Sequence, residues 1–224
     1  MITIITSCIK RELYLVRLLN SIRSVGAWDK IEFEHFIVYQ GGEPSDKLRA
    51  FIKDLPFANK IVFGTTKKVE SVCDVMHSCV TRAKYPIIFK IDDDRTLLSN
   101  DFLLRAYELC IKMPQALIYP VSVDGRGYYD DDVRRRQTVF LERSNVYITV
   151  GGHNAVRGSY LVPLDTIKQT PLLGGGQTDP QIMVVHTLKH HLPCFQCMDG
   201  LIIETQETDS GQHHRKQNPD GQIW

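Results

Sequence analysis

Five short apolar runs occur at regular intervals along the first half of the chain. They are rich in β-branched and aromatic side chains, which is typical of buried strands. The runs are residues 2–5, 33–39, 60–63, 86–91 and 116–119. Between them, apolar residues recur at spacings of three and four, as in helices with one buried face. These helical segments are residues 15–25, 43–54, 69–83 and the stretch that leads to about residue 113.

Strands and helices therefore alternate, and this order predicts an α/β fold with a mostly parallel sheet flanked by helices on both faces. In such sheets, ligands bind outside the carboxyl ends of the strands. Residues 6–8, 40–42 and 92–94 each follow or end a predicted strand. We expect these three segments to meet at one edge of the sheet.

The second half of the chain has a different pattern. A polar stretch at 124–136 predicts a loop, because its glycines and charges offer little to bury. Short strands are expected around residues 140–148, a helix after Pro180, and a last strand at 201–203 before a polar tail at 204–224. There is no internal repeat and no linker rich in serine or proline, so the 224 residues predict a single domain.

Asp92, Asp93 and Asp94 directly follow the strand predicted at 86–91. Three adjacent carboxylates repel one another, and they are tolerated in a solvated turn or around a divalent cation. Mg²⁺ and Mn²⁺ prefer carboxylate oxygens and keep coordination positions open for phosphate. The alternative is a turn that only precedes the next helix, with Ser99 or Asn100 as its N-cap.

Composition excludes few classes of function, but it indicates the cellular location of the protein. The formal net charge of +1 gives no electrostatic argument for a nucleic-acid or membrane partner. No apolar stretch is long enough to span a bilayer, and the N-terminus lacks the pattern of a signal peptide. The six cysteines fall mostly in apolar segments, which suits a reducing compartment. These features predict a cytoplasmic protein, and peripheral association with a membrane would need no spanning segment.

Two motifs carry a resemblance to a known family. The first is Ile4-Ile5-Thr6-Ser7 with Arg11, followed by a helix with Tyr14, Leu15, Leu18, Leu19, Ser21 and Ile22. The second is the strand that ends in Ile91-Asp92-Asp93-Asp94. In this order they resemble the family-two glycosyltransferases of GT-A fold, whose DxD-type motif binds a metal. The resemblance covers most of the chain and implies a GT-A (nucleotide-diphospho-sugar transferase) fold.

The resemblance also implies roles for individual residues. It places the nucleotide-sugar donor and metal on residues 1–120, and the acceptor side on residues 121–224. The residues implied to contact the donor are Thr6, Ser7, Arg11, Gln40, Asp74, Asp92 and Asp93. The residues implied to bind Mn²⁺ or Mg²⁺ are Asp93, Asp94, His213 and His214. Gln40 and Asp74 are departures: the family usually has an acid at the first position and an Arg-Asn pair on the helix of the second.

Gly176-Gln177-Thr178-Asp179 is placed like the acidic motif that supplies the catalytic base of the family. Asp179 is therefore the candidate base, although an aspartate before Pro180 is also an ordinary helix N-cap. His153 follows two glycines and is a candidate for the acceptor side, or a structural histidine. His213 and His214 could fold over the diphosphate, or could simply belong to a terminal tail.

A cluster at His190, His191, Cys194 and Cys197 could be mistaken for a zinc site. Structural zinc sites usually need two spaced ligand pairs on turns, whereas these cysteines flank Phe195 in an expected strand. Core packing is the better interpretation of this cluster.

Together, these features predict a metal-dependent glycosyltransferase, inverting in mechanism, that moves a sugar from a UDP-sugar or similar donor to an acceptor hydroxyl. A sugar-phosphate nucleotidyltransferase is an alternative, but it would normally show a glycine-rich loop, and residues 6–11 contain no glycine. A non-catalytic binding module of the same fold is another, against which the intact Asp92, Asp93, Asp94 and Asp179 argue. The oligomeric state is left open.

Overall fold

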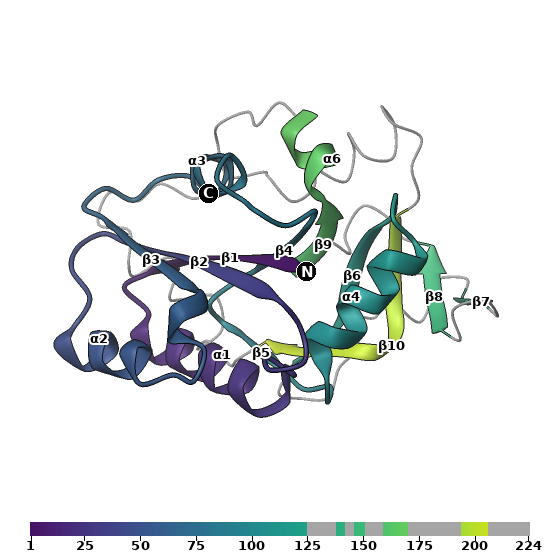
Figure 1. The fold of residues 1–224 in the computed structure, drawn as a ribbon, viewed down its shortest axis with the longest axis horizontal. Coiled ribbons are helices and arrows are strands. Elements are labelled where there is room, and N and C mark those ends of the chain that lie inside the picture. Colours follow the sequence, from purple (N-terminus) through teal and green to yellow (C-terminus); the bar gives the residue numbers. More distant parts are fainter. Residues whose placement is uncertain (125–137, 142–145, 151–158, 170–193, 206–224) are drawn as a thin grey trace.

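The computed structural model describes residues 1–124, 138–141, 146–150, 159–169 and 194–205 (Figure 1). Its strands form one mixed sheet. They are β1 (Ile2–Ile9), β2 (Phe33–Gln40), β3 (Ile61–Thr66), β4 (Ile87–Ile91), β5 (Arg95–Leu97), β6 (Leu117–Asp124), β7 (Thr138–Leu141), β8 (Val146–Val150), β9 (Ser159–Pro163) and β10 (Cys194–Thr205). The helices are α1 (Glu12–Val25), α2 (Asp46–Lys53), the 3-10 turn η1 (Ala58–Lys60), α3 (Val72–Val80), α4 (Phe102–Lys112) and α6 (Leu164–Gln169).

The strand order is β3-β2-β1-β4-β9-β6-β10-β8-β7, with β5 paired to β10 off this path. The first four strands are parallel, and β10 is parallel to β6. Between β4 and β6, β9 runs antiparallel to both neighbours. The predicted α/β architecture, a mostly parallel central sheet flanked by helices, is confirmed.

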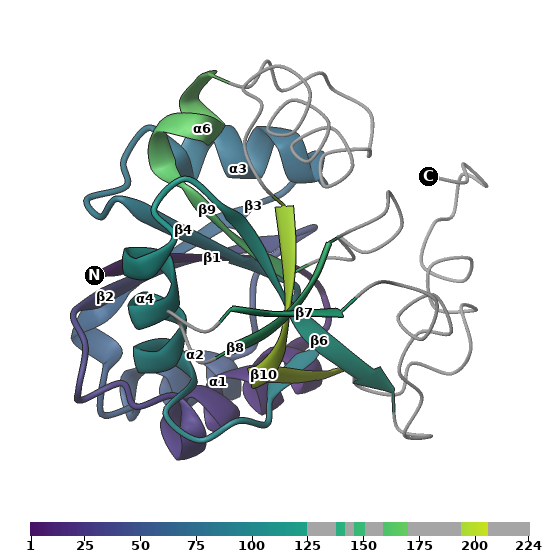
Figure 2. The same cartoon turned by 90° about the vertical axis from the view of Figure 1, so that its right-hand side faces the viewer.

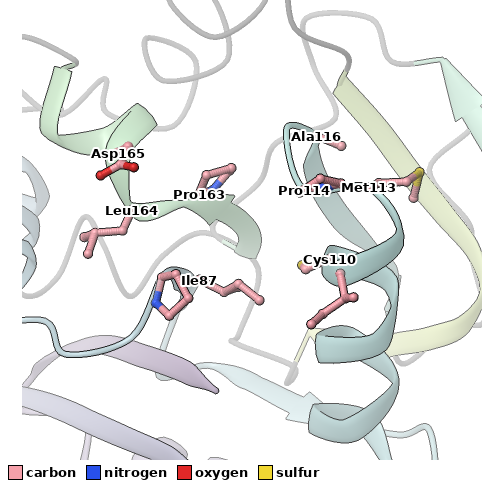
Figure 3. Close-up of a pocket in the computed structure, with 10 residues that line it drawn as sticks. Ile87, Cys110, Met113, Pro114, Ala116, Pro163, Leu164 and Asp165 are labelled. Atoms are coloured by element: carbon pink, nitrogen blue, oxygen red, sulfur yellow. The ribbon is translucent and has the colours of Figure 1, made fainter.

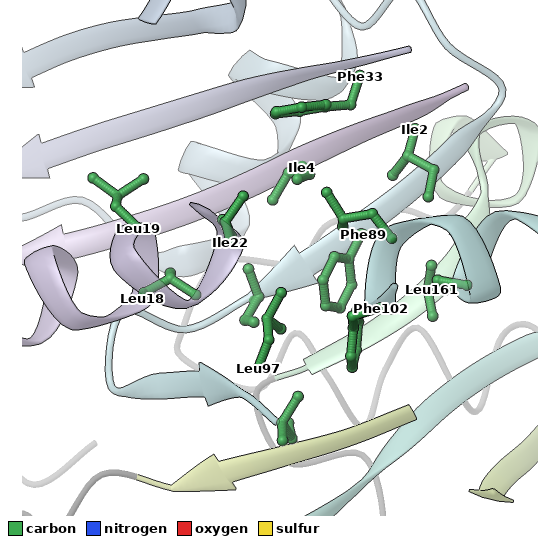
Figure 4. Close-up of a cluster of buried hydrophobic side chains, with 14 of the residues drawn as sticks. Ile2, Ile4, Leu18, Leu19, Ile22, Phe33, Phe89, Leu97, Phe102 and Leu161 are labelled. Atoms are coloured by element: carbon green, nitrogen blue, oxygen red, sulfur yellow. The ribbon is translucent and has the colours of Figure 1, made fainter. Parts of the chain in front are cut away.

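Helices cover both faces of the sheet (Figures 1 and 2). The larger apolar core lies under α1, α2 and α4, and Figure 4 shows part of it, with Leu18, Leu19 and Ile22 of α1 next to β1 and Phe89 near Phe102. The rings of Phe89 and Phe102 stack with centroids 5.5 Å apart. The smaller core lies under α3 and α6 on the opposite face. Burial on both faces explains why the first strands read as continuous apolar runs.

Local sequence explains the elements nearest the site. In α1, Leu15, Leu18, Leu19 and Ile22 fall on one face and are buried, as their spacing predicts. The start of α2 is capped by Ser45, whose hydroxyl accepts a hydrogen bond from the backbone N–H of Leu48 at 3.2 Å. These two helices fix the loops that follow β1 and β2.

The main differences from the sequence prediction lie after the acidic triplet. A short strand, β5, precedes α4, and three residues are too few to show a period. The N-cap of α4 is Asp101, in a left-handed conformation with φ 56°, so the expectation of Ser99 or Asn100 was wrong. The Ser99 hydroxyl instead accepts a hydrogen bond from the backbone N–H of Ile202 at 2.7 Å, which ties β5 to β10.

In the second half, the short strands expected around 140–148 are present as β7 and β8. The strand expected at 201–203 lies in the last part of β10. This strand includes Cys194 and Cys197, which were expected in a strand. It also includes residues 204–205, which the sequence prediction placed in the polar tail. The strand β9 and the helix α6 were not predicted. The helix expected after residue 180, the loop at 125–136 and residues 206–224 lie outside the described residues. Within the described residues, no helix has the length and apolarity to cross a membrane.

Leu18 and Leu13 provide a matched test of the α1 packing, because Leu18 is fully buried and Leu13 is 61% exposed on the same helix. We expect Leu18→Ala to lower the free energy of unfolding by about 2–5 kcal/mol, from lost burial and a residual cavity. Leu13→Ala should change it by no more than about 0.5 kcal/mol. Urea unfolding of both variants measures this, and equal losses would contradict the packing of α1.

Candidate functional site

The acidic triplet lies where β4 ends. The backbone N–H of Arg95 donates to the carbonyl of Asp92 at 3.3 Å, and this turn leads directly into β5. Asp93 is fully buried, while Asp92 and Asp94 are partly exposed. The buried strand therefore delivers three carboxylates to one tight turn, as the sequence predicts.

Arg11 lies between β1 and α1, as the N-cap residue of that helix, and binds two of these carboxylates. Its Nε donates to Oδ2 of Asp93 at 3.1 Å, and its Nη2 donates to Oδ1 of the same residue. Its Nη1 lies 3.4 Å from Oδ2 of Asp94. This two-pronged pairing is the strongest geometry available to an arginine and a carboxylate. It joins the start of α1 to the end of β4.

Two further cations complete the cluster. The Lys90 ammonium donates to Oδ1 of Asp92 at 2.6 Å, although Lys90 belongs to the buried part of β4. The Arg95 Nε lies 3.5 Å from Oδ1 of Asp94. Each acid of the triplet therefore faces at least one positive charge. The repulsion expected from the sequence is offset by these charges.

The pKa values reflect these surroundings. Burial raises the pKa of Asp93 to about 7, against the opposing effect of Arg11 and with help from the neighbouring Asp94. For Asp92, burial also acts to raise the pKa, but the charges of Lys90 and Arg95 outweigh it and the pKa is lowered. Burial and the nearby Asp93 raise the pKa of the Cys8 thiol, so it stays protonated and can hydrogen-bond Asp93.

One oxygen in the triplet stands apart. Asp94 Oδ1 is buried and has no hydrogen-bond partner among the described residues, although it faces the charge of Arg95. A buried acceptor without a hydrogen bond calls for an explanation, and a bound ion is one. A carboxylate oxygen is also what Mg²⁺ and Mn²⁺ prefer. The triplet thus fits a divalent cation at Asp94.

The remaining metal ligands are not visible in this part of the chain. The described residues contain no group of three or more His, Cys, Asp or Glu side chains that could hold a metal. Both oxygens of Asp93, a predicted ligand, face Arg11. The predicted ligands His213 and His214 lie outside the described residues, as do the predicted base Asp179 and the acceptor-side residue His153.

Gln40 links the ends of three elements. Its amide nitrogen donates to the Ser7 hydroxyl at 2.5 Å, and its amide oxygen accepts from the backbone N–H of Glu70 at 2.5 Å. Gln40 is fully buried. The three segments expected to converge therefore do so, since Gln40 joins the ends of β1 and β2 and Arg11 joins the end of β1 to the triplet.

Two predicted donor residues have structural partners. The Thr6 hydroxyl lies 2.9 Å from Nε2 of His35 in the interior, so a donor contact through this side chain would require that bond to break. Asp74 lies in the first turn of α3, where its carboxylate accepts from the hydroxyl of the N-cap Ser71 at 2.7 Å. The backbone N–H of Asp74 in turn donates to the Ser71 hydroxyl at 3.2 Å, and these two hydrogen bonds explain the helix start by themselves.

Three groups around the triplet were not predicted from the sequence: the counter-ions Lys90 and Arg95 and the thiol of Cys8. Lys90 carried a signal, because a lysine inside a buried apolar strand needs a partner. Arg95 carried a weaker one, as a cation directly after three acids. Nothing in the sequence indicated that Cys8 would contact Asp93 from another strand.

A pocket of about 310 Å³ lies away from this cluster (Figure 3). It is lined mainly by apolar residues from the start of β4, the end of α4 and the β9–α6 junction, among them Ile87, Cys110 and Leu164. Parallel strands begin on this side of the sheet. It is therefore not the edge where ligands of such sheets bind.

Comparison with known proteins places the fold. No family model matches the chain, and no curated relative matches it. Among solved structures, GalNAc-T7 with UDP, GalNAc and Mn²⁺ matches with a TM-score of 0.70 at 10% identity, covering 94% of this chain and 44% of that one. S. aureus TarS 1–349 with UDP-GlcNAc matches with a TM-score of 0.67 at 13% identity, covering 93% and 59%. The same TarS fragment with UDP gives 0.68 at 14%, covering 92% and 60%.

These structures are GT-A glycosyltransferases, and the protein has the GT-A fold. At such low identity, the likeness speaks to the fold alone. The chain also spans less than two thirds of the length of the matched structures. The residues of the site must therefore carry any functional conclusion.

His35, fully buried near the start of β2, gives the fold a defined pH response. Burial lowers the pKa of His35 to about 3, whereas an unfolded histidine titrates near 6.5. Below about pH 6.5 the unfolded chain gains a proton that the folded protein does not. As the pH decreases from about 6.5 to about 3, the free energy of unfolding should therefore fall by about 1.4 kcal/mol for each pH unit.

His35→Gln removes this proton uptake and can still hydrogen-bond Thr6. We would measure the free energy of unfolding of both proteins by denaturant unfolding at each pH. The wild-type value minus the variant value should decline by about 1.4 kcal/mol for each pH unit between about pH 6 and pH 4. A difference that stays constant over this range would show that His35 is not held neutral.

Proposed function

We propose that this protein is a glycosyltransferase that moves a sugar from a nucleotide-diphosphate donor, UDP favoured, to an acceptor hydroxyl. The GT-A fold supports this, as does the position of the acidic triplet at the carboxyl end of β4. The solved structures of similar fold contain UDP, UDP-GlcNAc, or UDP with GalNAc and Mn²⁺. A glycan or another hydroxyl-bearing molecule is the proposed acceptor.

A single observation carries the proposal of metal dependence: the buried Oδ1 of Asp94 has no hydrogen bond among the described residues. We assign Asp94 as the dominant ligand of Mn²⁺ or Mg²⁺. Asp93 could join it only by leaving Arg11, and His213 and His214 are the proposed ligands from the tail. A divalent cation bound there would stabilise the negative charge of the departing diphosphate.

Donor binding is assigned to residues 1–120 and the acceptor side to residues 121–224. Ser7, Arg11 and Asp92 are the other proposed donor contacts: Arg11 binds Asp93 and Asp94, and Ser7 is hydrogen-bonded to Gln40. Asp92, itself part of the triplet, is the proposed contact to the ribose or to a metal-bound water. Gln40 and Thr6 keep their places through internal hydrogen bonds, so we assign them to shaping the donor site. Asp74 is the proposed polar contact from α3.

The proposed mechanism is inverting. The acceptor oxygen attacks the anomeric carbon from the face opposite the diphosphate, the bond from that carbon to the diphosphate oxygen breaks, and Asp179 takes the acceptor proton. His153 is the proposed contact on the acceptor side. One base and one Lewis acid suffice for this reaction.

We also propose a cytoplasmic location, with peripheral membrane association compatible with it. Among the described residues, Cys8 and Cys79 are free and buried. Such cysteines are typical of a reducing compartment, where they behave as small apolar side chains.

The metal assignment predicts that release of nucleotide from a UDP-sugar requires Mn²⁺ or Mg²⁺. Asp94→Asn should strongly reduce this turnover while the protein stays folded, because a neutral amide binds the cation much more weakly than a carboxylate. The control is Asp46→Asn, an exposed acid in the first turn of α2, which should keep normal turnover. Activity is followed as nucleotide released from a panel of nucleotide sugars, and undiminished turnover in excess EDTA would overturn the assignment.

Asp179→Asn separates a base from a helix cap. Asparagine caps a helix about as well as aspartate, so stability and UDP binding should hardly change. Turnover should fall by roughly 10²–10⁴-fold, the usual contribution of a positioned general base. We would measure kcat and the melting temperature on the same preparation. Near-normal kcat would remove Asp179 from the mechanism and leave the donor site untouched.

A further inference from the structure

The apolar pocket at the start of β4 has the size of a small-ligand site (Figure 3). Its volume of about 310 Å³ falls at the lower end of the range of such sites, which is about 300–1,000 Å³. It is about twice the volume of an apolar cavity that encloses benzene, roughly 150 Å³. The pocket therefore has room for a chain of roughly ten carbon atoms.

Prolines fix the walls of this pocket. Pro86 precedes β4, Pro163 ends β9 and Pro114 follows α4, and all three line the pocket. A proline ring holds φ near about −65°. The backbone N–H of Leu164 also donates to the carbonyl of Pro86 at 2.8 Å, which ties the β9–α6 junction to the start of β4. Such walls are formed before a ligand arrives, so less free energy is lost to ordering when it binds.

The lining selects the chemistry of the ligand. Among the described residues that line the pocket, Asp165 is the only charged one, and it is exposed in the first turn of α6. The rest of the lining consists of apolar side chains and the thiol of Cys110. An apolar chain can therefore fill the interior. The carboxylate at the rim attracts a positively charged head group and repels a negatively charged one.

Ile111 continues the apolar surface to the outside. It lines the pocket from α4 and is 57% exposed. A single exposed apolar side chain is ordinary on a protein surface, but this one borders an apolar cavity. A chain seated in the pocket would also cover part of Ile111.

We propose that this pocket binds the alkyl chain of a small amphiphile of roughly ten carbon atoms, with a positively charged head group at Asp165. The chain displaces water from the apolar lining, and the head group stays at the exposed rim. The pocket lies where β4 begins, whereas the acidic triplet lies where β4 ends. Binding of the amphiphile is therefore independent of the proposed donor site.

Isothermal titration calorimetry with alkylammonium chlorides, each below its micellar concentration, tests the site directly. We expect the wild type to bind one equivalent of nonylammonium. From hexylammonium to nonylammonium, each added methylene should tighten binding by about threefold to fourfold, because it buries more apolar surface. Nonanoate has the same number of carbon atoms and the opposite head charge, so it should bind at least about threefold more weakly than nonylammonium.

Variants of the lining identify the place of binding. Ala116 lines the pocket and is 3% exposed, so Ala116→Leu should fill part of it and weaken nonylammonium binding at least about tenfold. Ile111→Ser removes apolar surface from the rim and should weaken binding about threefold. Leu13→Ser on α1 is the matched control, because Leu13 is similarly exposed, at 61%, and should bind as wild type. Asp165→Asn should lower the affinity for nonylammonium to that for nonanol and leave nonanol binding unchanged.

The proposal fails if the folded wild type shows no saturable binding of nonylammonium. A folded Ala116→Leu protein that binds as tightly as the wild type would also overturn it. Should that variant not fold, Ile111→Ser decides, because an exposed side chain can be changed without loss of the fold. Equal affinities of Ile111→Ser and Leu13→Ser would then contradict the site. Nonanoate binding as tight as that of nonylammonium would rule out a cationic ligand, and with it the proposal.

Discussion

Three carboxylates at the end of a buried strand need counter-charges, and the structure around the site follows from how these are supplied. Arg11 provides one from the N-cap of α1, across 82 positions of sequence from Asp93. To make this contact, the loop after β1 must lie beside the end of β4. The parallel pairing of β1 and β4 brings the two ends together, so the ion pair and the sheet support each other.

Polar links of the same kind appear at both ends of the sheet, while apolar contacts fill its faces. At the site edge, Gln40 joins β1, β2 and the segment before α3. At the opposite edge, Glu34 accepts hydrogen bonds from Thr3 and from the backbone N–H of Lys84, just before β4. Apolar burial is not directional, so such links are suited to fixing the relative positions of the strand ends.

The division between apolar faces and polar ends also explains what the sequence could predict. The parallel strands are continuous apolar runs, and α1 has a clear helical period, so both are visible locally. The strand β9 is equally apolar, but its place between β4 and β6 depends on pairing across more than 40 residues. The triplet was identifiable as a site from its position after a strand. Of its partners, Lys90 and Arg95 lie next to the triplet and had only weak signals in the sequence. Cys8 had none, because a contact between distant segments leaves no local pattern.

An acidic turn with paired counter-charges can serve stability alone or can also bind a cation. The contacts of Asp94 distinguish these two roles. Asp92 and Asp93 are held by cations at hydrogen-bonding distance, as expected of a cluster that serves stability alone. Asp94 has only long contacts, at 3.4 Å to Arg11 and 3.5 Å to Arg95, and one buried oxygen without a hydrogen bond. Buried carboxylate oxygens are rarely left in this condition, since the lost hydration is not replaced. The close ion pairs therefore hold Asp92 and Asp93 but not Asp94, whose lost hydration a bound cation could replace.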